Sequence, residues 1–70
     1  MNSSKIEALV RNIILQRRLP FAMRSVAASP AGWDIEVDET SGGIRAFTVA
    51  SGRPLAIRFA IQEHLEAELE

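Results

Sequence analysis

The densest group of side chains capable of chemistry is a short acidic segment. Its carboxylates belong to Asp34, Glu36, Asp38 and Glu39. Carboxylate oxygens are the ligands that Ca²⁺ prefers, and an EF-hand loop also needs a glycine at its sixth position and a glutamate at its twelfth. Counted from Asp34, those positions hold Glu39 and Arg45. We therefore predict no metal site, and we interpret Asp34, Glu36 and Asp38 as the solvent face of a strand.

Nucleophilic catalysis and zinc binding both have few candidate residues. His64 is the only histidine, and the chain contains no cysteine. A single imidazole outside an HExxH pattern is a poor zinc site, and no serine lies in a GxSxG motif. A chain this short also has little room for a ligand pocket of a few hundred Å³. We therefore expect a protein that is not an enzyme, with no catalytic residue, metal or cofactor.

The turn Ser51-Gly52-Arg53 is a candidate anion site. If it leads from a strand into a helix, free backbone amides and a guanidinium converge at a helix N-terminus, where phosphate binds readily. Helix capping with a solvated Arg53 is the favoured interpretation, because every helix must satisfy its first amides. A weak anion-binding protein using Ser51, Gly52 and Arg53 remains an alternative.

A second alternative is association with nucleic acid. Residues 1–24 contain five basic residues and one acid, whereas residues 63–70 contain four acids and no base. A local basic patch would favour contact with phosphates. Its arginines would be Arg11, Arg17, Arg18 and Arg24. The formal net charge of -1 argues against binding by bulk charge, so nucleic acid is possible but not favoured.

Length and composition limit the remaining classes. Seventy residues predict one small α+β domain spanning residues 1–70. No apolar run approaches the roughly 20 residues that a membrane helix needs, and charged residues interrupt the first apolar pattern, unlike a signal peptide. We expect a cytoplasmic protein with no disulfides and no membrane partner.

A helix is predicted at the start of the chain. Apolar residues recur at three- and four-residue steps from Ile6 to Ile14, which is the period of one helix face. Ser4 and Glu7 have capping-box spacing and predict the helix start. Pro20 predicts its end.

A hairpin is predicted in the middle of the chain. Residues 33–38 alternate between apolar and acidic side chains, and residues 44–50 follow after a loop with two glycines. The favoured register gathers every large side chain of the hairpin except Ile44 on one face, which a slip of one residue would not do. It pairs Asp38 with Ile44, Ile35 with Phe47 and Trp33 with Val49.

Two segments each allow two interpretations. Residues 21–29 have a mixed pattern that favours a strand with a bulge, and a short helix is the alternative. Residues 55–61 alternate as a strand would but also recur at four-residue steps. The absence of a helix breaker after Pro54 favours a helix here, capped by Ser51 or Gly52.

The resulting order is α-β-β-β-α. This is an α+β fold, with a three-stranded antiparallel meander and two helices packed on one face. The first and third strands are unprotected edges.

The chain has more apolar surface than this small fold can bury. Leu15 and Leu19 lie off the apolar stripe of the first helix, and the last helix is apolar almost all round in its first half. Excess apolar surface on a small protein usually marks an interface. We therefore predict a protein-interaction module that forms a homodimer and binds a protein partner. The predicted interface residues are Leu15, Leu19, Ile57 and Ile61.

Overall fold

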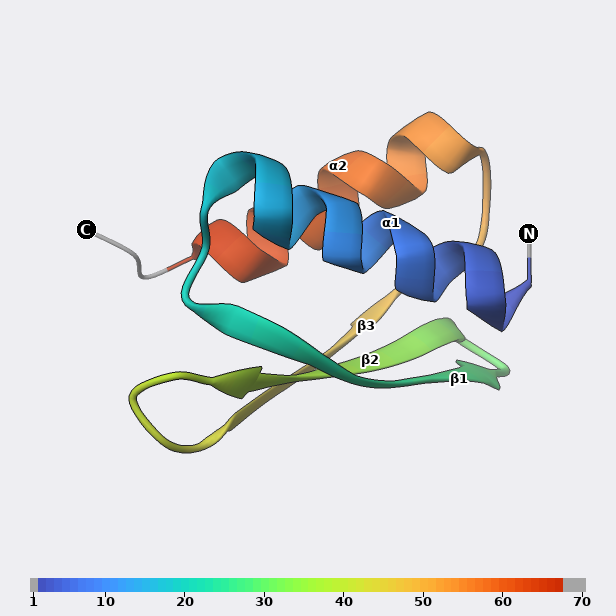
Figure 1. Ribbon diagram of the computed structural model, residues 1–70. Coiled ribbons are helices and arrows are strands. Elements are labelled where there is room, and N and C mark those ends of the chain that lie inside the picture. The colour runs from blue at the N-terminus through green and yellow to red at the C-terminus, as the bar shows by residue number, and fades with distance from the viewer. Residues whose placement is uncertain (1, 68–70) are drawn as a thin grey trace.

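The computed structural model describes residues 2–67 and confirms the predicted order of elements (Figure 1). The elements are α1 (Ser3–Arg17), β1 (Phe21–Ser29), β2 (Gly32–Glu39), β3 (Ile44–Val49) and α2 (Pro54–Glu66). The strands form one antiparallel sheet in the order β1-β2-β3, and both helices cover the same face of it. The fold is therefore α+β, a strand meander covered by two helices.

One apolar core lies between the sheet and the helices. It forms because each helix and each strand turns one apolar stripe toward the others. The buried residues are Ile6, Val10, Ile13, Phe21, Ile35, Val37, Val49, Ile57, Ile61 and Leu65. Trp33 and Phe47 share this face of the sheet but are only half-buried, at the margin of the core.

The N-terminus of α1 differs from the predicted capping box. Asn2 is the N-cap, and its Oδ1 accepts a hydrogen bond of 2.9 Å from the backbone N–H of Lys5. Ser4 lies inside the first turn, and Glu7 instead pairs with Arg11 at 2.8 Å. The prediction was wrong because asparagine and serine cap about equally well, so the sequence contained two candidate starts.

The C-terminus of α1 ends in a Schellman motif. Arg18 adopts a left-handed conformation with φ of 52°. The backbone N–H of Leu19 donates to the carbonyl of Ile14 at 3.0 Å, and that of Arg18 donates to Leu15 at 3.4 Å. This motif brings the residue after the left-handed position back toward the helix. Leu19 therefore packs against the core and is half-buried.

The segment of residues 21–29 is a strand, so the alternative of a short helix is excluded. It pairs with β2 from Phe21 to Ser29, and the register shifts between Met23 and Ser25. An extra residue on one strand of an antiparallel pair makes a β-bulge, which accounts for the mixed sequence pattern.

The predicted hairpin register is confirmed. Asp38 pairs with Ile44, Ile35 pairs with Phe47, and Trp33 pairs with Val49. The strand β3 ends at Val49, one residue before the predicted boundary.

The segment after Pro54 is a helix, but its cap is neither Ser51 nor Gly52. Arg53 is the N-cap residue and makes no side-chain hydrogen bond to the helix. The fixed φ of Pro54 suits the first turn of a helix, so the proline sets the start of α2 and the two residues before Arg53 remain in the connection.

Candidate interaction surfaces

Three carboxylates of the acidic segment, those of Asp34, Glu36 and Asp38, lie on the outer face of the sheet, away from the helices, as the alternation predicts. Arg24 pairs with Asp38 at 3.0 Å and with Glu36 at 3.5 Å. Asp34 accepts a hydrogen bond of 2.8 Å from Thr48. Side chains of the neighbouring strands β1 and β3 therefore pair with or donate hydrogen bonds to these carboxylates. Within residues 2–67, no three His, Asp or Glu side chains are grouped so that they could hold a metal ion.

His64 lies on α2 and stacks on a strand. Its ring is 4.7 Å from the ring of Phe47, at an interplanar angle of 10°. This stacked pair lies at the edge of the core, between α2 and β3.

The candidate anion turn is exposed. Ser51, Gly52 and Arg53 all lie on the surface before α2. The structure gives Arg53 a capping position without a side-chain contact to the helix. The turn thus offers the first amides of α2 and the exposed guanidinium of Arg53, and nothing in the described residues brings the two together around an anion.

The four candidate arginines do not form one patch. Arg11 pairs with Glu7 on α1, and Arg17 pairs with Glu66 of α2 at 2.6 Å. Arg24 extends over the outer face of the sheet, the side of the molecule opposite the helices. Arg18 is the C-cap of α1 and is exposed.

The predicted interface residues differ in how far they are buried. Ile57 is 1% exposed and Ile61 is fully buried, because both lie on the side of α2 that faces the sheet and α1. They belong to the core and are absent from the surface. Leu19 is half-buried by the Schellman motif. Leu15 is 78% exposed.

Two further exposed apolar residues of α2 were not predicted individually. Leu55 is 63% exposed and Phe59 is 57% exposed. Each is two residues from a buried isoleucine, which corresponds to about 200° around a helix. The apolar run of residues 55–61 contained this signal, but the pattern is apolar on all sides and does not show which side is buried.

The helices α1 and α2 lie side by side and run in the same direction (Figure 1). Arg58 of α2 donates to Asn12 at 3.3 Å and to Gln16 at 2.9 Å. Arg17 and Glu66 connect the C-terminal ends of the two helices. The helix layer is therefore joined by polar contacts from its middle to its C-terminal end.

An apolar surface remains on the outside of this layer. Leu15 lies opposite the buried stripe of α1, and Leu55 and Phe59 lie one turn apart opposite the buried stripe of α2. We call Leu15, Leu55 and Phe59 the helix face. Large apolar side chains exposed in this number on a small protein are unusual enough to require a reason.

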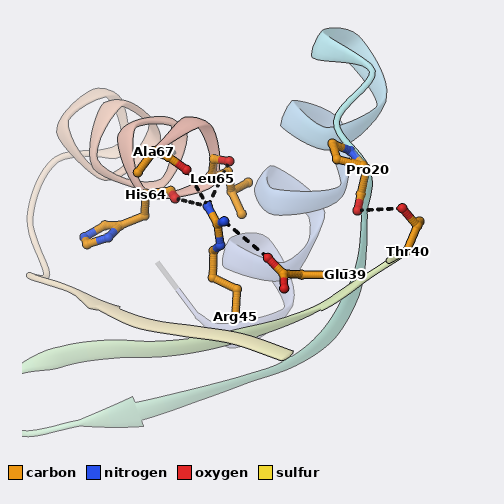
Figure 2. Close-up of polar contacts among 7 residues, drawn as sticks. All are labelled: Pro20, Glu39, Thr40, Arg45, His64, Leu65 and Ala67. Carbon is orange, nitrogen blue, oxygen red and sulfur yellow. Dashed lines mark hydrogen bonds and ion pairs between the residues drawn. The ribbon is translucent and has the colours of Figure 1, made fainter. Parts of the chain in front are cut away.

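Arg45 is the residue that connects the sheet to the end of α2 (Figure 2). It lies on the inner face of β3, and its Nη1 donates to the carbonyls of His64 at 3.0 Å and Ala67 at 2.9 Å. Its Nη2 pairs with Glu39 at 3.2 Å, and its guanidinium lies 4.9 Å from the centre of the Phe21 ring. A cation at the last carbonyls of a helix satisfies acceptors that have no partner within the helix.

Replacing Arg45 with methionine, which keeps the aliphatic stem, is expected to lower the free energy of unfolding by about 1–3 kcal/mol. The loss arises because the carbonyls of α2 and the carboxylate of Glu39 lose a charged donor. Urea unfolding followed by Trp33 fluorescence measures it.

The matched control for Arg45 is Arg58→Met, because within residues 2–67 the guanidinium of Arg58 hydrogen-bonds to the side-chain amides of Asn12 and Gln16 and to no backbone carbonyl or carboxylate. We expect this control to change the free energy of unfolding by less than about 1 kcal/mol. Equal losses in the two variants would contradict a special role for Arg45.

Comparison of the chain with protein-family models, with curated protein sequences and with solved structures finds no match. The part of the chain that the structure describes contains no pocket. None of its helices has the length and apolar character needed to span a membrane.

Proposed function

We propose that the protein is a non-enzymatic protein-interaction module that functions as a homodimer, with the helix face as the contact between copies. The observation that carries the proposal is the exposure of Leu15, Leu55 and Phe59 on the side of the helix layer that faces away from the sheet. Small domains gain stability by pairing when their own core is limited.

The size of the helix face supports a second copy as its occupant. Its three side chains expose roughly 300–400 Å² of apolar surface, which is in the range of the largest functional patches on small proteins. Two copies together would cover about 700 Å². The smallest specific interfaces bury about 1,200 Å², of which about 58% is apolar. That is about 700 Å² of apolar surface, the amount that the two helix faces would supply.

Symmetry also supports self-association. A two-fold dimer uses the same surface on both subunits, so one apolar patch is sufficient. In such a dimer the helices lie at the centre and the two sheets lie outside. The edges of β1 and β3 then remain accessible to a protein partner.

Substitution of the helix face tests the proposal. We expect the wild-type protein to show twice the chain mass by light scattering at micromolar concentration, and the double variant Leu55→Ser with Phe59→Ser to show the mass of one chain. Both positions are exposed, so the variant should keep its helices, as circular dichroism can verify.

The control variant is Ile44→Ser. Ile44 is 51% exposed but belongs to β3 and the outer face of the sheet. We expect this variant to remain a dimer. A double serine variant that keeps the wild-type mass would refute the helix face as the interface, and a wild-type monomer would refute the dimer itself.

A further inference from the structure

Two charges at one end of the helix layer have no ion-pair partner within residues 2–67. Most of the charged side chains around them are paired: Arg11 with Glu7, and Arg17 with Glu66. Arg18 at the end of α1 and Glu63 on α2 are both exposed and form no ion pair in this range. They are of opposite sign, one on each helix.

Both charges lie past a residue of the helix face, toward the C-terminal end of its helix. Glu63 follows Phe59 by four residues on α2, which is the spacing of neighbours on a helix surface. Arg18 is the exposed C-cap residue of α1 and follows Leu15 by three positions. Because α1 and α2 run in the same direction, the two charges lie toward the same end of the layer, past the apolar residues.

A face-to-face dimer can place the helices in two ways. A two-fold axis across the helices sets α1 against the partner's α1 in antiparallel orientation. If that contact is centred on Leu15, Arg18 lies beside Arg11 of the partner subunit, a contact between like charges. In the same arrangement, Glu63 lies against Leu55 of the partner subunit.

A two-fold axis parallel to the helices gives the other arrangement. It sets α1 against the partner's α2 with the same direction, so Leu15 lies against Phe59 of the partner subunit. At the C-terminal end of this contact, Arg18 meets Glu63 of the partner subunit, and symmetry repeats this pair. Charge complementarity of this kind fixes register and favours this arrangement over the first, in which Arg18 gains no acidic partner.

We propose that the dimer has this second arrangement: α1 of each copy packs on the partner's α2, and Arg18 pairs with Glu63 of the partner subunit. This inference depends on the proposed function, because it specifies the geometry of the same helix face. Its consequence is two stacked helix layers, of two helices each, between two sheets, and an association that weakens as salt screens the charge pairs.

Charge reversal tests the arrangement. Arg18→Glu and Glu63→Arg are each expected to raise the dissociation constant of the dimer about tenfold, because each variant creates two contacts between like charges. The variant that carries both substitutions should return to within about threefold of the wild-type constant, because the charges are then exchanged and opposite again.

The matched control is Arg53→Glu, which makes the same change of charge at the other end of α2. We expect it to leave the dissociation constant unchanged within about twofold, as for a charge outside the interface. All variants replace exposed residues, and circular dichroism verifies that they fold.

The possible failures are distinguishable. A wild-type monomer would overturn both the proposed function and this inference. A wild-type dimer that tolerates the single reversals, or that the combined reversal does not restore, would overturn the arrangement alone. Isotope-filtered NMR gives a second readout: we expect contacts between the methyl groups of Leu15 and the ring of Phe59 of the partner subunit. Contacts between the two Leu15 side chains would contradict the proposal.

Discussion

Replacing Gly32 with alanine is expected to lower the free energy of unfolding by about 3–4 kcal/mol, because strain and overlap add. Gly32 has φ of +136°, a conformation that side chains disfavour. A Cβ at this position would lie 2.1 Å from the carbonyl oxygen of Val49 and 2.8 Å from the backbone N of Ser51. Both neighbours are backbone atoms, which cannot move aside as a flexible side chain can.

Gly42→Ala separates the two causes at Gly32. Gly42 also has a positive φ, of +97°, but apart from its own chain neighbours nothing lies within 4 Å of the position that a Cβ would occupy. We expect this control to lose only about 1 kcal/mol, the contribution of backbone strain. Urea unfolding followed by Trp33 fluorescence measures both variants. Equal losses of free energy of unfolding would show that overlap with the backbone of residues 49–51 contributes nothing at Gly32.

The second large effect is expected at Ile35. Its side chain is fully buried on the central strand, where it pairs with Val26 on one side and Phe47 on the other. Ile35→Ala removes contacts that nothing else can fill, and such substitutions cost about 2–5 kcal/mol. A domain of this length has a total stability of about 4–10 kcal/mol, so we expect the variant to be unfolded in part at 37 °C.

The adjacent residue supplies the control for Ile35. Glu36 points to the outer face of the sheet and pairs with an exposed Arg24 at 3.5 Å. We expect Glu36→Ala to change the free energy of unfolding by less than about 1 kcal/mol, as for other exposed pairs. Thermal unfolding by circular dichroism compares the two variants; a larger loss at Glu36 than at Ile35 would contradict the described placement of the core.

The hairpin could be predicted in detail because its signal is local. Alternation from Trp33 to Asp38 fixes which side chains share a face, and the short loop before Ile44 leaves only one register that gathers the apolar residues. The structure agrees with that register at each predicted pair.

The helix ends were harder to predict because neighbouring residues compete for the same role. Asn2 and Ser4 are both good N-caps, and only the structure shows that Asn2 is used. The left-handed conformation of Arg18 places Leu19 against the core, yet arginine is not the residue expected at such a position.

Contacts between distant residues account for the remaining differences. Alternation places Arg45 on the same face as Phe47, but its partners on α2 lie 19–22 residues away in the sequence. In the same way, Ile57 and Phe59 are equally apolar, and only the position of the sheet and α1 determines that Ile57 is buried and Phe59 exposed.

Sedimentation equilibrium of the wild-type protein tests most directly whether another copy of the chain covers the helix face. The measurement spans concentrations from about one hundred nanomolar to one hundred micromolar. We predict a weight-average mass that rises from one chain to two and then stays constant. A mass of one chain at every concentration would mean that Leu15, Leu55 and Phe59 remain open to water, and would contradict the dimer and its arrangement together.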